Sequence, residues 1–88
     1  MRYRIRVSQQ AQNQIRRLDP EASRRIRAFL EVRLAQLDHP RQIGNPLRSE
    51  ERLWRYRVGD YRIIVEIQDE RLVILVVELG HRREIYRR

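Results

Sequence analysis

Three arginines are placed to act together in the stretch LWRYRVGDYRIIVEI, residues 53–67. Gly59 and the aspartate after it predict a two-residue hairpin loop, because glycine is the expected residue at the first central position. Such a loop pairs Arg57 with Arg62. It puts Arg55 on the same face, because side chains alternate along a strand. Like charges directly opposite each other destabilise a sheet. The pattern therefore indicates that an anionic group, such as a phosphate, normally occupies this face.

A second group of basic and aromatic side chains follows the predicted last strand, which runs from Arg71 to Leu79. Gly80 ends that strand, so the chain after it emerges at one end of the sheet. The candidate residues there are His81, Arg82, Arg83 and Tyr86. Proteins grip single-stranded RNA by stacking bases on aromatic rings while cationic side chains hold the phosphates. The C-terminal segment therefore favours RNA as the ligand.

Each of these features also has a purely structural explanation. The three hairpin arginines could form a solvated basic face that Glu66 and Glu78 neutralise in part. Tyr86 could be a packing residue, and a histidine that follows a glycine in a turn, as His81 does, is more often structural than catalytic. His81 is also the side chain here that titrates near neutral pH when unperturbed. Three arginines on one sheet face of a basic chain favour the phosphate site over a solvated surface.

The composition sets limits on the function. The chain has 88 residues, which is enough for one domain over residues 1–88 and leaves little room for a second core. It carries 20 basic residues, all arginine, against 12 acidic ones, a net charge of +8. A small domain this basic normally binds a polyanion or an acidic protein. Without cysteine there are no thiolate metal ligands, disulfides or cysteine nucleophiles.

The N-terminus has no apolar segment of the kind that begins a secretory signal, and the apolar run Leu72–Val77 is too short to span a bilayer. We expect a soluble, cytoplasmic protein with no membrane partner and no small-molecule cofactor. The elements expected at the N-terminus are a strand over residues 2–7, a helix that Ser8 caps, and a second helix that Asp19 caps with Pro20 in its first turn. That second helix carries one apolar stripe, formed by Ala22, Ile26, Leu30, Leu34 and Leu37.

The second half of the chain predicts strands. Residues 41–51 contain Gly44 and an Asn-Pro pair and predict a loop. Three strands follow, and the last is apolar on both faces, which places it inside the sheet. The hairpin face opposite the arginines should pack under the helices; its residues are Trp54, Tyr56, Val58, Tyr61, Ile63, Val65 and Ile67. The predicted fold is α+β, in the order β-α-α-β-β-β, with a helical hairpin on one face of a four-stranded, mainly antiparallel sheet.

With these residues identified, the chain resembles the RelE family of bacterial toxin–antitoxin systems. The resemblance rests on NPLR (residues 45–48), on the hairpin stretch already quoted, and on VVELGHRREIYRR (residues 76–88), in this order and spacing. It implies a toxin that enters the ribosomal A site and cuts messenger RNA by metal-independent attack of the ribose 2′-OH. It also implies an acidic RelB-like antitoxin as partner, beside the ribosome and messenger RNA.

The resemblance also assigns roles to residues. The catalytic positions it implies are Arg55, Arg57, Arg62, Arg82 and Tyr86. Further RNA contacts are expected from Arg48, His81 and Arg83. The reaction needs a base, charge to stabilise the transition state, and an acid for the leaving oxygen.

One departure from the family changes the chemistry. Well-studied members carry lysine where this chain has Arg55 and Arg57. Arginine keeps its proton in proteins, so neither residue is a credible general base, whereas each can clamp phosphate. The base stays open among Tyr86, His81 and a group on the ribosome. Two other functions remain as alternatives: a ParE-like poison of DNA gyrase, which shares the fold, and a non-catalytic basic module that binds nucleic acid. The segment GHRREIY (residues 80–86) favours the ribonuclease over the gyrase poison.

Overall fold

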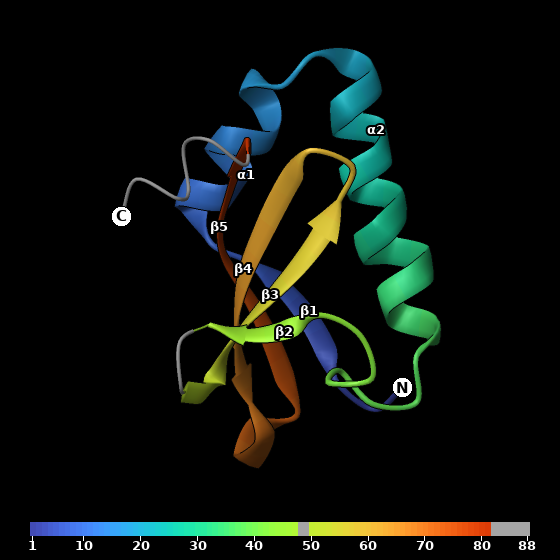
Figure 1. The fold of residues 1–88 in the computed structure, drawn as a ribbon, viewed down its shortest axis with the longest axis vertical. Coiled ribbons are helices and arrows are strands. Elements are labelled where there is room, and N and C mark those ends of the chain that lie inside the picture. Colours follow the sequence, from blue (N-terminus) through green and yellow to red (C-terminus); the bar gives the residue numbers. More distant parts are fainter. Residues whose placement is uncertain (48–49, 82–88) are drawn as a thin grey trace.

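The computed structural model describes residues 1–47 and 50–81, which form a helical layer on a five-stranded mixed sheet (Figure 1). The strand order is β1-β5-β4-β3-β2; β1 runs parallel to β5 and all other neighbours are antiparallel. This confirms the α+β fold class and the mainly antiparallel sheet. In chain order the elements are β1 (Arg4–Val7), α1 (Gln9–Arg17), α2 (Pro20–Ala28), the π turn η1 (Phe29–Arg33), the 3-10 turn η2 (Leu34–Gln36), β2 (Asn45–Leu47), β3 (Glu50–Val58), β4 (Tyr61–Gln68), the 3-10 turn η3 (Asp69–Arg71) and β5 (Val73–His81).

The sheet has five strands where the sequence predicted four. The additional strand, β2, pairs with β3 at one edge of the sheet. Gly44 and the Asn-Pro pair predicted a loop over residues 41–51, and that prediction was wrong for residues 45–47, which form β2, and for residues 50–51, which begin β3. Proline is tolerated in an edge strand, because its missing N–H can lie on the side that has no neighbour. Pro46 is therefore compatible with a short edge strand.

β5 lies between β1 and β4, which confirms the prediction that the strand apolar on both faces is inside the sheet. Its C-terminal half extends beyond β1, and polar side chains of the first helix region bond its exposed backbone there. The Ser8 hydroxyl donates to the carbonyl oxygen of Val77 at 2.7 Å. The backbone N–H of Leu79 donates to Oε1 of Gln14 at 2.7 Å. This edge therefore has partners in the helical layer rather than a neighbouring strand.

Both predicted helix starts are confirmed. The Ser8 side chain accepts a hydrogen bond from the backbone N–H of Ala11 at 3.1 Å. The Asp19 carboxylate accepts one from the backbone N–H of Ala22 at 2.8 Å, with Pro20 in the first turn. Each cap satisfies a donor that the helix cannot bond itself. No helix in residues 1–47 and 50–81 is long and apolar enough to cross a membrane.

The second helical segment changes its hydrogen-bond pattern before it ends. After α2, the backbone N–H of Leu34 donates to the carbonyl oxygen of Phe29, which closes the wider ring of a π turn. A 3-10 turn then completes the segment at Gln36. The extra residue of a π turn rotates the side chains that follow it relative to a regular α-helix, and such turns are frequent at functional sites. Two residues of this turn, Phe29 and Arg33, line the cavity described below.

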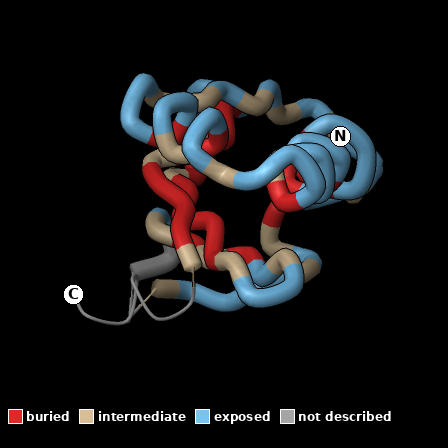
Figure 2. The backbone as a smooth tube through the Cα atoms, turned by 90° about the horizontal axis from the view of Figure 1, so that it is seen from above, coloured by how far each residue is buried: buried red, intermediate tan, exposed pale blue. Residues whose placement is uncertain are grey.

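The core lies between the helices and one face of the sheet, and the outward sides of the helices are exposed (Figure 2). The predicted apolar stripe and the predicted apolar hairpin face both contribute to it. Its buried members on the hairpin are Trp54, Tyr56, Ile63, Val65 and Ile67, with Val58 and Tyr61 packed beside them. This confirms which hairpin face lies under the helices.

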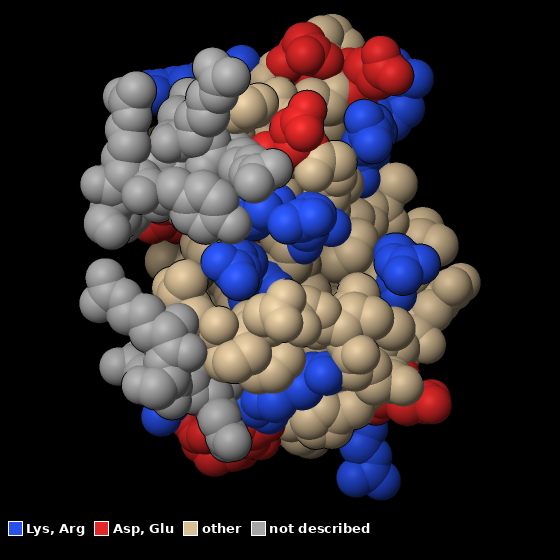
Figure 3. Space-filling model, in the orientation of Figure 1, with Lys and Arg blue, Asp and Glu red and all other residues tan. Residues whose placement is uncertain are grey.

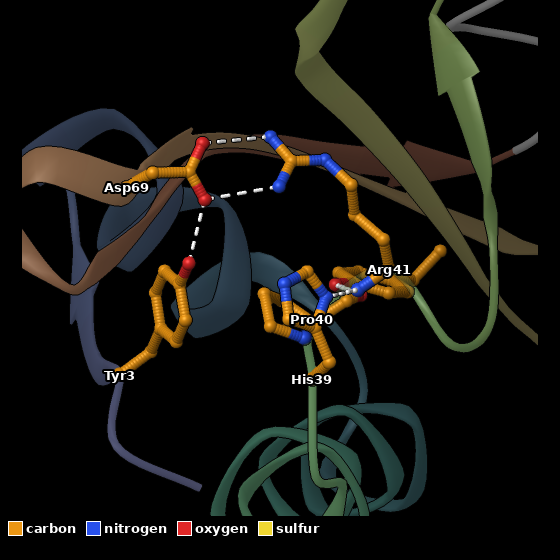
Figure 4. A network of polar contacts seen from close by, with 6 residues as sticks. Tyr3, His39, Pro40, Arg41 and Asp69 are labelled. Atoms are coloured by element: carbon orange, nitrogen blue, oxygen red, sulfur yellow. Dashed lines mark hydrogen bonds and ion pairs between the residues drawn. The ribbon is translucent and has the colours of Figure 1, made fainter.

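A network of polar contacts fixes the loop between η2 and β2 (Figure 4). The Arg41 guanidinium donates through two nitrogens to the two carboxylate oxygens of Asp69, each at 3.0 Å. The Tyr3 hydroxyl donates to Asp69 at 2.5 Å. Trp54 Nε1 donates to the carbonyl oxygen of Ile43 at 2.7 Å. These bonds join the first strand, the loop and the turn after β4.

Candidate nucleic-acid interface

The β3–β4 hairpin has the register that the sequence predicted. Val58 pairs with Tyr61 across the turn, and Arg57 lies directly opposite Arg62. Gly59 has φ +59°, a left-handed backbone conformation that glycine adopts without steric strain. Alternation along the strands then puts the arginines on the face opposite the helices, as predicted.

The three arginines differ in how far solvent reaches them. Arg57 is exposed and Arg55 is partly buried, but Arg62 is only 1% exposed. The sequence predicted that all three would lie on a solvent-exposed face. For Arg62 this prediction was wrong, because the residue is buried. Arg62 lies on β4, which has β3 on one side and β5 on the other, whereas Arg55 and Arg57 lie nearer the sheet edge.

Arg62 is held by its surroundings. Opposite it on β5 is Gly80, which presents no side chain, and one diagonal step away is Glu78, itself only 8% exposed. In the part of the chain that the structure describes, no buried side-chain nitrogen or oxygen lacks a hydrogen-bond partner. A buried charge is tolerated only when its hydrogen bonds are made. Arg62 is therefore a cation fixed in orientation, unlike a mobile surface arginine.

A cavity of about 390 Å³ lies at the β2–β3 edge beside these arginines. Four arginines line it, and none of the lining residues that the structure describes is acidic. Its lining consists of Phe29, Arg33, Ile43, Gly44, Asn45, Arg55, Tyr56, Arg57 and Arg62. Figure 3 shows the side of the molecule on which β2 and β3 lie in front: arginines cross its middle, and acidic side chains lie mainly near its upper and lower margins. This cavity is therefore suited to bind an anion.

Two lining residues could not be assigned to the site from the sequence. Arg33 comes from the π turn that follows α2 and reaches the cavity across the sheet edge. Gly44 has φ +83°, and a Cβ there would lie 2.4 Å from the carbonyl oxygen of Arg55. The only sequence signals were a basic residue four positions after Phe29 and a glycine before the Asn-Pro pair. Neither signal indicates that Arg33 or Gly44 lies next to the β3–β4 hairpin.

Tyr56 lines the cavity but its hydroxyl is already used. The hydroxyl donates a hydrogen bond to the carbonyl oxygen of Pro40. Burial of the ring raises the pKa of Tyr56 above its ordinary range. The phenol is therefore a fixed, protonated donor that anchors the loop, and it is unsuited to accept a proton from a substrate.

The structure does not bring His81 to the arginine face. His81 is the last residue of β5 and pairs with Tyr61, whose side chain lies on the helix-facing side. The two rings meet edge to face, with centroids 5.7 Å apart. Four other predicted site residues lie outside the described residues: Arg48, Arg82, Arg83 and Tyr86. Among the described residues, no group of three His, Asp or Glu side chains could hold a metal ion.

Comparison with known proteins places the chain in a family. A family model described as "ParE toxin of type II toxin-antitoxin system, parDE" matches residues 5–86. The chain is 32% identical over 90 residues to Toxin RelG of Mycobacterium tuberculosis, with 100% of both sequences covered. It superposes on a chain of the toxin–antitoxin complex RelBE2 of the same organism with a TM-score of 0.80, at 26% identity and 93% coverage of each chain. For the isolated E. coli RelE toxin the TM-score is 0.74, at 25% identity, with 97% of this chain and 92% of that one covered.

Proposed function

Because this chain belongs to the RelE/ParE superfamily of toxins from toxin–antitoxin systems, we propose that it is a ribosome-dependent messenger RNA endoribonuclease. The observation that carries the proposal is the cavity at the β2–β3 edge, where four arginines meet and none of the described lining residues is acidic. A phosphodiester under attack gains negative charge, and preorganised cations stabilise it without reorganising during the reaction. A messenger RNA phosphate fits that requirement.

The arginines take distinct roles in this reaction. The ribose 2′-OH attacks the neighbouring phosphorus, and the bond to the 5′ oxygen breaks, which leaves a 2′,3′-cyclic phosphate and a 5′-OH. Arg62, buried and fixed, is placed to stabilise the charge on the non-bridging oxygens. Arg55 and Arg57, nearer the surface, position the RNA backbone. Arg82, with Arg48 and Arg83, is proposed to add further phosphate contacts.

The general base is not one of the cavity arginines, because a guanidinium does not release its proton. The Tyr56 hydroxyl is bonded to Pro40, and His81 lies on the helix-facing side of the sheet. We propose that Tyr86, or a group that the ribosome supplies, accepts the 2′-OH proton. A requirement for such a group explains why cleavage would depend on the ribosome.

The proposed partner in the cell is an acidic RelB-like antitoxin. The chain carries a net charge of +8, and the similar RelBE2 structure is described as a toxin–antitoxin complex. An acidic segment that covers Arg55 and Arg57 would exclude RNA by occupying the same charges. Because ribosomes are the proposed site of action, the proposed location is the cytoplasm.

A second function has one observation in its favour. The matching family model carries the description of a ParE toxin. ParE-like toxins share this fold and poison DNA gyrase. They generally lack the arginines and tyrosine after the last strand, which this chain has as Arg82, Arg83 and Tyr86. The ribonuclease therefore remains the favoured function.

Primer extension on messenger RNA after a short pulse of expression separates the candidates. The ribonuclease predicts cuts that follow the reading frame and vanish when translation of the same message is blocked. A gyrase poison predicts an SOS response without such cuts. A basic module without catalytic activity predicts neither, and it would leave the purified protein bound to RNA without cleavage.

A further inference from the structure

A second basic groove lies on the same sheet face, at the opposite edge. It has a volume of about 500 Å³ and is lined by Arg4, Arg6, Gln68, Arg71 and Val73. Two of these arginines come from β1 and the third ends the turn after β4. None of the three belongs to the sequence motifs that predicted the RNA site.

The strand register shows that both basic groups share one face. Arg6 pairs with Leu75, Leu75 with Glu66, and Glu66 with Leu53, so these side chains form one row across four strands. Leu53 lies two residues before Arg55 and therefore on the same face. The face opposite the helices thus carries one basic group at the β1 edge and another at the β3 edge.

The two acidic residues of the adjoining turn are paired elsewhere, whereas Glu66, on the same sheet face, accepts a hydrogen bond from the groove residue Gln68 at 2.6 Å and is the one described carboxylate beside the three groove arginines. In the turn that ends at Arg71, Asp69 binds Arg41 and Tyr3. The next residue, Glu70, accepts from Arg52 at 2.9 Å. Within the described chain, neither Arg4 nor Arg6 forms an ion pair. The groove therefore keeps its positive charge although it adjoins an acidic turn.

The two basic groups are too far apart to bind one phosphate. Three strand spacings separate β1 from β3, and the rows are offset along the strands, which gives roughly 15–20 Å between the groups. Glu66 and Glu78 lie on the same face between them. A short RNA strand that crossed this space would pass over carboxylates. One phosphate, or one short RNA segment, would therefore not bind both basic groups at once.

We propose that the groove of Arg4, Arg6 and Arg71 binds the phosphate backbone of folded ribosomal RNA and docks the toxin while messenger RNA occupies the β3 edge. Arg4 and Arg6 lie two residues apart on one strand, about 7 Å, which suits adjacent phosphates. Among the described lining residues of the groove, Val73 alone is apolar. Protein interfaces normally have an apolar centre, so this lining fits a phosphate backbone better than an antitoxin segment. The inference rests on the proposed function, because it takes the ribosome as the place of action.

The test measures binding to ribosomes without messenger RNA as a function of salt. Each neutralised phosphate contributes roughly 0.7–0.9 to the log–log salt slope. The double variant Arg4→Gln/Arg6→Gln is expected to reduce the slope by about 1.5 and to weaken binding roughly tenfold at about 0.15 M salt. A matched control, Arg17→Gln/Arg24→Gln, removes the same charge from exposed helix positions and should change the slope far less. Binding of a short single-stranded RNA should respond equally little to both variants.

Three results would overturn the proposal: an unchanged slope, a loss no greater than in the control, or a loss confined to antitoxin binding. Arg4→Lys/Arg6→Lys keeps the charge and should retain most of the slope, and melting temperatures show whether each variant is folded. Cleavage separates this inference from the proposed function. If the wild-type protein cuts no messenger RNA but the salt slope still depends on Arg4 and Arg6, the docking groove is supported and the ribonuclease function is rejected. If the wild-type protein cuts messenger RNA and the salt slope does not change in the double variant, the ribonuclease function is supported and the docking groove is rejected.

Discussion

Arg41 and Arg57 show how one side-chain type serves two purposes in this molecule. Arg41 binds Asp69 through two hydrogen bonds and lies over the ring of Trp54, 5.8 Å from its centroid, so its charge is neutralised within the fold. Arg57 is exposed and lies opposite another arginine, and no described acidic residue pairs with it. The first arrangement stabilises the protein. The second lowers its stability and leaves charge for a ligand, which supports the proposed site at the β2–β3 edge.

The largest effect is expected at Arg62. If it stabilises charge that develops in the transition state, Arg62→Ala should lower the single-turnover cleavage rate by about 10²–10³ on programmed ribosomes. Arg62→Lys should restore only part of that rate, because a point charge cannot bridge two phosphate oxygens. Since Arg62 is buried, circular dichroism and melting temperature must accompany the rates. A folded Arg62→Ala protein that cuts at the wild-type rate would remove Arg62 from the mechanism.

The next effect concerns the loop that closes the cavity. Gly44→Ala should lower the free energy of unfolding by at least about 1–3 kcal/mol, because its φ of +83° strains any residue with a side chain and a Cβ there meets the backbone of Arg55. Denaturant unfolding measures it. Gly59→Asn is the control: asparagine tolerates φ near +59°, and the nearest atom is the end of the flexible Arg25 side chain. Equal losses in the two variants would show that the close approach at Gly44 is unimportant.

A smaller effect tests the neutralised region. The hydrogen bond from Arg41, with that from Tyr3, lowers the pKa of Asp69 to about 2. The stabilisation is therefore complete above the unfolded pKa of about 3.9 and is lost as the pH falls toward 2. The Asp69 side chain is 51% exposed, so Asp69→Asn should cost no more than about 1 kcal/mol at neutral pH. The difference in unfolding free energy between Asp69→Asn and wild type should shrink as the pH falls from 4 to 2. A constant difference would mean that the charge of Asp69 does not stabilise this network.

The smallest effect is expected in the salt dependence of RNA binding. Arg57→Ala should flatten the log–log slope for a single-stranded RNA by roughly 0.7, the value for one phosphate contact. Arg24→Ala, an exposed helix position, is the control. If both variants keep the wild-type slope, Arg57 does not contact phosphate.

The sequence correctly predicted the local structure and the face of the sheet on which each hairpin side chain lies. The Gly59 turn determined the hairpin register, and alternation along the strands then separated the arginine face from the core face. Ser8 and Asp19 marked both helix starts because capping depends only on nearby backbone donors.

Features that depend on contacts between distant segments were not predictable. Alternation shows which face a side chain occupies but not what covers it, so the burial of Arg62 was missed. The short strand β2 exists because β3 offers a free edge, and its proline suggested a loop instead. Arg33 lines the cavity together with hairpin residues more than twenty positions away, a contact that no local pattern in the sequence indicates.

The central claim is that one arginine region serves stability and the other serves RNA cleavage. Its most direct test measures melting temperature and single-turnover cleavage of messenger RNA on programmed ribosomes, using the same preparations of wild type, Arg41→Ala and Arg57→Ala. We predict that Arg41→Ala melts at a lower temperature but cuts at the wild-type rate well below its melting point. We predict that Arg57→Ala melts no lower than wild type and cuts more slowly. A slower rate in Arg41→Ala together with an unchanged rate in Arg57→Ala would contradict this account.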